Sequence, residues 1–125
     1  MVNTKPPRKK PGNPESKLQT ACISWFSTQY RKLWEAKKLH AIPNGGKRNL
    51  LEAAAMKRSG TVAGVWDLHL TIPKRPYAGM WIEIKATTDL TDNQIAFMES
   101  HKDHYAFAVC RSLDEFRKAI NDYLV

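Results

Sequence analysis

The 125-residue sequence contains only two cysteines and no long run of apolar residues. Cys22 and Cys110 lie far apart between apolar neighbours, so we expect reduced, buried thiols rather than a disulfide framework. No run approaches the roughly 18 apolar residues of a membrane span, and no apolar stretch of a signal peptide follows the basic N-terminal segment. These absences argue against a secreted disulfide-rich domain and against a membrane protein, and they predict a soluble protein of the cytoplasm.

Acidic residues are also scarce. The chain carries 20 lysines and arginines against 12 aspartates and glutamates, a net charge of +8 at pH 7. This excess favours a polyanionic partner such as nucleic acid, although many basic proteins bind no anion specifically. A chain of 125 residues that is 42% hydrophobic fits one domain with a single core.

Residues 1–13 hold three prolines, four basic residues and no acid. This composition predicts a flexible basic arm in front of a folded domain over residues 14–125. The arm either lies along phosphates or only solubilises the chain, and the composition fits both roles.

The remaining residues predict alternating helices and strands. Asn13 and Pro14 open the first helix, which should run to about Lys32, and Thr91 and Gln94 form a capping box at the start of another helix. The other segments are strands at 39–42, 62–72, 80–86 and 105–110, and helices at 47–59 and 112–124. This order predicts a mixed α/β domain around one small sheet.

The segment GMWIEIKA, residues 79–86, combines a strand's apolar pattern with two charges on one face. Side chains alternate along a strand, so Glu83 and Lys85 share a face with Trp81 and lie opposite the apolar residues. If residues 62–72 pair with this strand in a hairpin centred on Arg75, Asp67 lies directly opposite Glu83. Opposed like charges destabilise a sheet, so such a pair favours a bound cation.

Two carboxylates that converge from neighbouring strands suit Mg²⁺, which takes oxygen ligands and retains several waters. A metal-bound water and a lysine beside it supply most of what hydrolysis of a phosphodiester needs. Asp67, Glu83 and Lys85 therefore predict a nuclease site. These three residues alone leave the alternative of a solvated face with a cross-strand ion pair.

The surrounding sequence strengthens the nuclease interpretation. GVWDL (64–68), IEIK (82–85), LTDNQIAFM (90–98) and the closing YAFAVCRSLDEFRKAINDYL resemble the VRR-NUC family, the virus-type replication-repair nucleases of the PD-(D/E)XK superfamily. The resemblance runs from about Glu15 to the C-terminus. It departs from the family at Trp66, where a proline commonly precedes the aspartate.

The resemblance implies a restriction-endonuclease-like α/β domain with a small mixed sheet flanked by helices. It implies Mg²⁺- or Mn²⁺-dependent cutting of DNA, with branched DNA such as a four-way junction as the substrate and a homodimer as the active form. Small stand-alone members of this kind are often encoded by phages, in which case the cytoplasm is that of the host, and they act in DNA repair.

The resemblance also implies roles for individual residues. Asp67 and Glu83 correspond to metal ligands, Lys85 to the catalytic lysine, and Gln94 to the glutamine that follows the core motif. Gln94 has an equally good structural explanation as the last member of the capping box.

Glu15 corresponds to the acidic residue that superfamily members often supply from the first helix as a metal ligand. A carboxylate near the positive end of a helix is favourable whatever the chemistry, and Gln19, one turn later, is a rival for the same role. His69 shares the predicted face with Asp67, where it either touches substrate or is an ordinary surface histidine.

Four basic residues lie between the first helix and the site strands, where they suit contact with DNA phosphates: Lys47, Arg48, Lys57 and Arg58. Two further functions remain open from the sequence. One is a nucleic-acid-binding module without catalysis, and the other is a restriction-type enzyme that cuts linear duplex DNA.

Overall fold

The computed structural model describes residues 13–43 and 49–125 of the chain. Residues 1–12 of the predicted basic arm lie outside this part, as do Lys47 and Arg48. Among the helices of the described residues, none has both the length and the apolar character needed to cross a bilayer.

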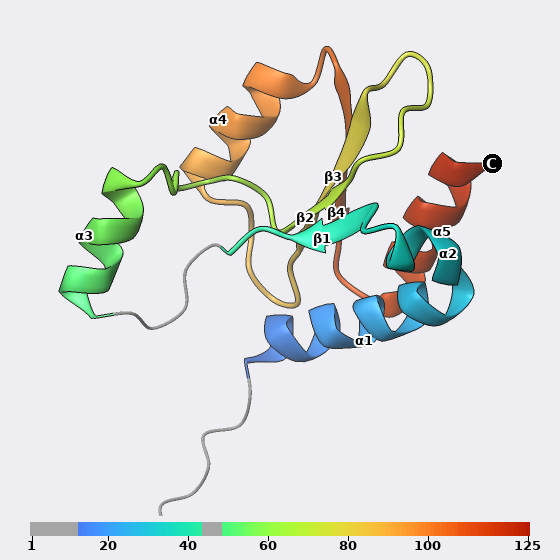
Figure 1. Ribbon diagram of the computed structural model, residues 1–125, viewed down its shortest axis with the longest axis horizontal. Helices are drawn as coiled ribbons and strands as arrows, with labels where there is room; N and C mark the ends of the chain where they lie inside the picture. The colour runs from blue at the N-terminus through green and yellow to red at the C-terminus, as the bar shows by residue number, and fades with distance from the viewer. Residues whose placement is uncertain (1–12, 44–48) are drawn as a thin grey trace, which may run out of the picture.

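Helices and strands alternate along the chain as the sequence predicted (Figure 1). The elements are α1 (Pro14–Gln29), α2 (Arg31–Glu35), β1 (Leu39–Ala41), α3 (Leu50–Arg58), β2 (Leu68–Leu70), β3 (Gly79–Ile84), α4 (Asp92–His101), β4 (Tyr105–Cys110) and α5 (Leu113–Leu124). The strands form one sheet in the order β1-β2-β3-β4, in which only the β3–β4 pair is parallel. The predicted small mixed sheet flanked by helices is confirmed.

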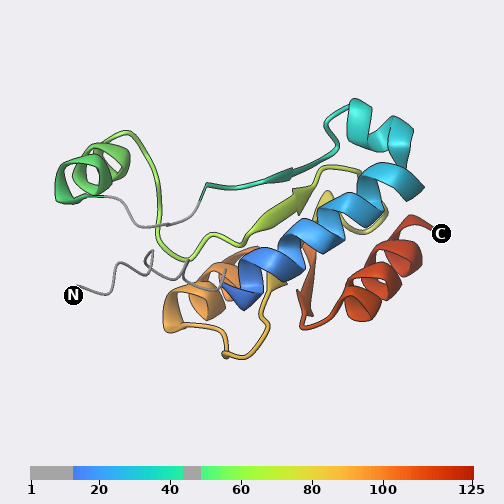
Figure 2. The same ribbon diagram turned by 90° about the horizontal axis from the view of Figure 1, so that it is seen from below.

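One face of the sheet is covered by α1 and α5, which lie side by side across it (Figure 2). Cys22 and Phe26 of α1 and Phe116 and Ile120 of α5 are buried against alternate residues of the strands. Cys22 and Cys110 are free and buried, as predicted.

The other face of the sheet packs against α4 through aromatic side chains. The ring of Phe97 on α4 meets that of Trp81 on β3 at 5.1 Å between centroids, and the ring of Phe107 on β4 at 6.1 Å. Trp66, which is fully buried, contacts Phe107 edge to face at 4.9 Å. The sheet therefore lies between α1 and α5 on one side and α4 on the other.

The first helix ends earlier than predicted. α1 stops at Gln29, and Tyr30, with φ −120° and ψ 54°, separates it from the short helix α2. The Tyr30 ring stacks on Phe26 at 5.4 Å, and its hydroxyl donates a hydrogen bond to Asn121 of α5. These tertiary contacts outweigh the local helical preference of the segment.

The second predicted strand, residues 62–72, is also shorter than expected, because regular pairing covers only β2. The predicted register is confirmed there, with Leu70 opposite Met80 and His69 opposite Trp81. Before β2, Gly64 has a φ of +93°, and a Cβ at this position would lie 2.5 Å from the backbone oxygen of Asn93. The chain therefore leaves the sheet in order to pass close to the start of α4.

α3 stands away from the rest of the domain (Figures 1 and 2). Asn49 caps it by accepting a hydrogen bond from the Glu52 N–H, and no residue of α3 is buried. The predicted helix over 47–59 is confirmed for residues 50–58.

The close approach at Gly64 can be tested against Gly60, which also has a positive φ, +109°, but has open space where a Cβ would lie. We expect Gly60→Ala to cost only the backbone strain, about 1–3 kcal/mol of unfolding free energy. Gly64→Ala should cost about 1–3 kcal/mol more, because its methyl group overlaps the Asn93 backbone. Urea denaturation of both variants measures the difference, and equal losses would show that the contact with α4 is loose.

Candidate active site

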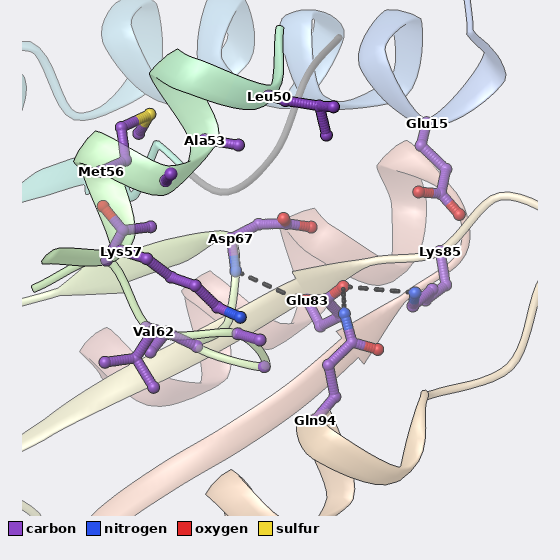
Figure 3. Close-up of a pocket in the computed structure, with 15 residues that line it drawn as sticks. Glu15, Leu50, Ala53, Met56, Lys57, Val62, Asp67, Glu83, Lys85 and Gln94 are labelled. Atoms are coloured by element: carbon purple, nitrogen blue, oxygen red, sulfur yellow. Dashed lines mark hydrogen bonds and ion pairs between the residues drawn. The ribbon is translucent and has the colours of Figure 1, made fainter. Parts of the chain in front are cut away.

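The residues predicted from sequence to form the site line one cavity of about 700 Å³. It lies between α3, the segment that leads into β2, the end of β3 and the first turn of α4 (Figure 3). Its lining includes Glu15, Lys57, Asp67, Glu83, Lys85 and Gln94. Gln19, the rival of Glu15, does not line it.

Asp67 and Glu83 hold each other in place through backbone bonds just beyond the end of the β2–β3 ladder. The Asp67 N–H donates to Glu83 Oε1 at 3.1 Å, and the Ile84 N–H donates to Asp67 Oδ2 at 3.0 Å. Each carboxylate thus accepts a hydrogen bond from a backbone N–H that, in a longer β2–β3 ladder, would have bonded to a backbone carbonyl. The predicted opposition of the two side chains is present, although β2 begins one residue after Asp67.

The charged face of β3 is not solvated. Glu83 is 2% exposed and Lys85 6% exposed, and the Lys85 ammonium lies 3.5 Å from Glu83 Oε2. Burial of a carboxylate and an ammonium carries a large desolvation cost, which a surface strand has no reason to incur. The alternative of a solvated face with a simple ion pair is therefore wrong.

Gln94 serves both as a helix cap and as a partner of the site. Its Oε1 accepts from the Thr91 N–H at 2.9 Å, which completes the predicted capping box, and its Nε2 donates to Glu83 Oε2 at 2.8 Å. The cap fixes the amide orientation, because the flipped amide would set N–H against N–H and oxygen against carboxylate. The sequence offered these two roles as alternatives, and the geometry combines them.

Two contacts hold the start of α4 near the segment before β2. The Trp66 indole N–H donates to the backbone carbonyl of Gln94 at 3.0 Å, and Gly64 allows the close backbone approach to Asn93. Trp66, the departure from the family pattern, therefore contributes packing and a hydrogen bond beside the site.

Burial, with a smaller contribution from neighbouring charge, raises the pKa values of Glu83 and Asp67. Burial raises the pKa of Glu83 to about 7, and the negative charge of Asp67 adds to this shift. Burial likewise raises the pKa of Asp67, with a further contribution from the charge of Glu15, while the Ile84 N–H opposes the rise. A bound cation would favour the charged forms of Asp67 and Glu83.

The donor set fits a hard divalent cation. Asp67 and Glu83 bring carboxylate oxygens to the same cavity, and Mg²⁺ is typically held by one or two carboxylates plus waters. Within residues 13–43 and 49–125, no three histidine, cysteine or acidic side chains are close enough together to hold a metal ion. Glu15 instead accepts a hydrogen bond from the Thr88 hydroxyl at 2.9 Å.

His69 lies on the predicted face but in the aromatic layer under α4. Its ring stacks on Trp81 at 4.0 Å between centroids, and its Nε2 is buried without a hydrogen-bond partner. Burial lowers the pKa of His69, so its neutral form is favoured.

Sequence reasoning missed two parts of the site. One is the apolar wall that α3 and the following segment provide through Leu50, Met56 and Val62. The other is the contact between Thr88 and Glu15, which are 73 residues apart. Neither follows from a local pattern, because both depend on how distant segments meet.

The mixed sheet, the opposed Asp67 and Glu83, and Lys85 two residues later define a nuclease-type domain of the PD-(D/E)XK superfamily. Residues 13–114 match the VRR-NUC domain family, so the chain belongs to that family. A solved structure described as a "VRR_NUC domain protein" shares 30% sequence identity and superposes with a TM-score of 0.74, over 91% of this chain and 90% of that one. No curated protein matches the sequence significantly.

The two roles of Gln94 can be separated by substitution. Gln94→Ala removes both the capping acceptor and the donor to Glu83, and should cost about 1 kcal/mol of unfolding free energy at pH 5.5 and more at pH 8, where Glu83 is charged. Gln94→Glu keeps an acceptor for the Thr91 N–H but sets a third carboxyl beside Glu83. We expect it to be close to wild type at pH 5.5, where that carboxyl can be protonated, and clearly less stable at pH 8. Urea denaturation in EDTA measures both, and a pH-independent Gln94→Glu variant would show that the bond to Glu83 is unimportant.

Proposed function

We propose that the protein is a metal-dependent, structure-specific DNA endonuclease that cuts branched DNA such as four-way junctions by hydrolysing phosphodiester bonds. The observation that carries the proposal is the burial of Glu83 and Lys85 beside Asp67 in a cavity. Stability alone gives no reason to bury a carboxylate and a lysine beside a second, half-buried carboxylate. Two carboxylates that can hold a divalent cation, with a lysine beside them, suit the hydrolysis of a phosphodiester.

In this proposal Asp67 and Glu83 hold Mg²⁺ or Mn²⁺. When bound, such an ion lowers the pKa of a coordinated water and polarises the phosphoryl oxygen. Lys85 donates to the scissile phosphate or to the attacking water, from a position fixed by its contact with Glu83. Gln94 holds one oxygen of Glu83, so that the carboxylate keeps a single orientation toward the cavity.

Basic residues near the cavity are suited to the flanking DNA. Lys57 lines the cavity, and Arg58 follows it in the last turn of α3. Together with Lys47 and Arg48, and with the net charge of +8, they would bind phosphates on either side of the cut.

A homodimer is part of the proposal, because paired cuts in a junction need two sites. α3 supports it, since Leu50 is 88% and Leu51 82% exposed and no residue of this helix is buried. Neighbouring exposed leucines on a helix that stands away from its own domain suit contact with a second copy.

The test compares cleavage of end-labelled four-way junction, flap and linear duplex DNA in Mg²⁺, Mn²⁺ or EDTA. We expect metal-dependent, symmetrically paired cuts in the junction and none in the linear duplex. Lys85→Met should reduce the rate about 100-fold or more, because it removes a charge that acts on the reacting phosphate. Lys102→Ala, an exposed lysine paired with Glu99 at the other end of α4, is the matched control and should cut normally.

The other outcomes identify the alternatives. Binding of DNA without cleavage under any metal would make the protein a nucleic-acid-binding module. Cleavage of the linear duplex at defined sites would make it a restriction-type enzyme. Unpaired single nicks in the junction would contradict the dimer.

A further inference from the structure

We propose that Thr88, itself held by Arg111, is a positioning residue that keeps the Glu15 carboxylate at the edge of the site. There the charge of Glu15 strengthens cation binding without Glu15 joining Asp67 and Glu83 as a ligand. This inference rests on the proposed function. It assigns a role to the loop between β3 and α4, which the sequence patterns did not identify.

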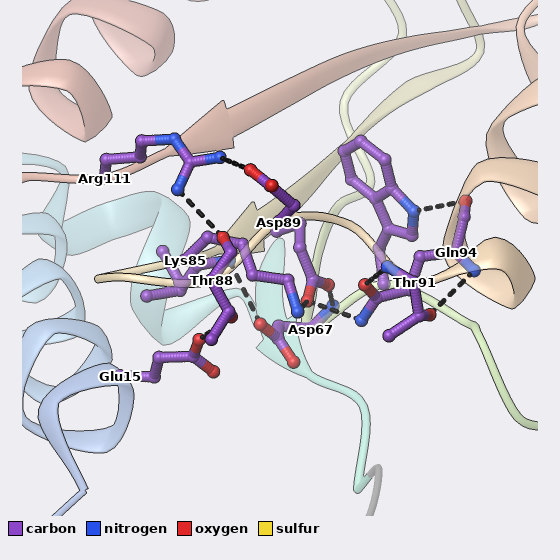
Figure 4. Close-up of polar contacts among 11 residues, drawn as sticks. Glu15, Asp67, Lys85, Thr88, Asp89, Thr91, Gln94 and Arg111 are labelled. Atoms are coloured by element: carbon purple, nitrogen blue, oxygen red, sulfur yellow. Dashed lines mark hydrogen bonds and ion pairs between the residues drawn. The ribbon is translucent and has the colours of Figure 1, made fainter.

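The contact between Thr88 and Glu15 joins the loop to α1 (Figure 4). The Thr88 hydroxyl donates to Glu15 Oε1 at 2.9 Å, and Thr88 lies three residues after Lys85. Glu15 is in the first turn of α1, where its own N–H donates to the side chain of the N-cap residue Asn13. The helix start thus fixes the backbone of Glu15, and Thr88 fixes its carboxylate.

Arg111 holds the loop from the other side. It follows β4 directly, and its guanidinium donates to the Thr88 carbonyl at 2.9 Å and lies 3.4 Å from an oxygen of Asp89. The Arg111 backbone N–H donates to Glu115 in the first turn of α5 at 3.3 Å. The Arg111 side chain therefore contacts two consecutive exposed residues of the loop, Thr88 and Asp89.

Glu15 is close enough to act on the site but is not grouped with its ligands. It lines the same cavity as Asp67, Glu83 and Lys85. Within the described ranges, however, no three acidic, cysteine or histidine side chains form a group able to hold a metal. The Thr88 bond accounts for both facts, because it ties the carboxylate to the loop after β3, beside the cavity, rather than to the pair of Asp67 and Glu83.

Without the Thr88 hydroxyl, Glu15 has a long side chain with several rotatable bonds beside open solvent. The carboxylate would then occupy many positions in solvent. Its charge would act less on the cavity, because water and salt screen exposed charges. The predicted consequence is weaker cation binding in a protein that remains folded.

The experiment measures Mn²⁺ affinity of the full chain by calorimetry in the absence of DNA. Thr88→Val removes the hydroxyl at nearly constant shape, and we expect it to weaken binding roughly tenfold, the lower end of losses for groups outside the ligand shell. Thr88→Ser keeps the donor and should bind like wild type. Thr87→Val, at the exposed neighbouring threonine, is the matched control and should also bind like wild type.

A double-mutant comparison tests whether Thr88 acts through Glu15. Glu15→Gln should weaken Mn²⁺ binding about as much as Thr88→Val, and the double variant should be no weaker than either single one. Both losses should shrink as NaCl is raised, because the effect is electrostatic. Melting temperatures of all variants establish that the change is not one of folding.

Three results would overturn the inference. Unchanged affinity in Thr88→Val, while wild type binds Mn²⁺ and Asp67→Asn does not, would reject the role of Thr88 and leave the proposed function standing. A loss in Glu15→Gln as large as in Asp67→Asn would make Glu15 a direct ligand. Wild-type protein that binds no Mn²⁺ would overturn the inference and the proposed metal dependence together.

Discussion

The site depends on two reciprocal hydrogen bonds that join Asp67 to β3. Glu83 accepts from the backbone N–H of Asp67, and Asp67 accepts from the backbone N–H of Ile84, the residue after Glu83. Each carboxylate accepts from a backbone N–H at the point where the β2–β3 ladder stops. The two like charges are therefore fixed side by side by the same contacts that end the strand. Lys85 and the Gln94 amide then complete a buried polar cluster around Glu83, and every member of it faces one cavity.

The orientation of this cluster depends on the aromatic packing of α4 against the same face of the sheet. Trp66 and the aromatic layer fix α4 against the strands, and the capping box at its first turn turns the Gln94 amide toward Glu83. A polar network of this kind is costly when one member is missing, because the remaining groups stay buried. The side chains of the site therefore depend on one another for their positions.

The sequence predicted the parts that follow from local rules. Alternation along β3 and a hairpin centred on Arg75 were enough to bring Asp67 opposite Glu83, and the capping box located the start of α4. Alternation could not predict that β2 begins only at Leu68, because side-chain carboxylates take the place of the ladder bonds before it. The isolated position of α3 and the contact of Thr88 with Glu15 depend on tertiary arrangement, for which a single sequence holds no periodic signal.

The most direct test of this account is the unfolding free energy of wild type and Glu83→Gln in EDTA as a function of pH. Burial raises the pKa of Glu83 from 4.5 to about 7, so between these values the folded state holds a proton that the unfolded state has lost. The account predicts that wild-type stability falls as pH rises through this interval and that Glu83→Gln falls less steeply. Parallel curves for the two proteins would show that Glu83 titrates as an ordinary solvated carboxyl, and would contradict its buried position beside Asp67.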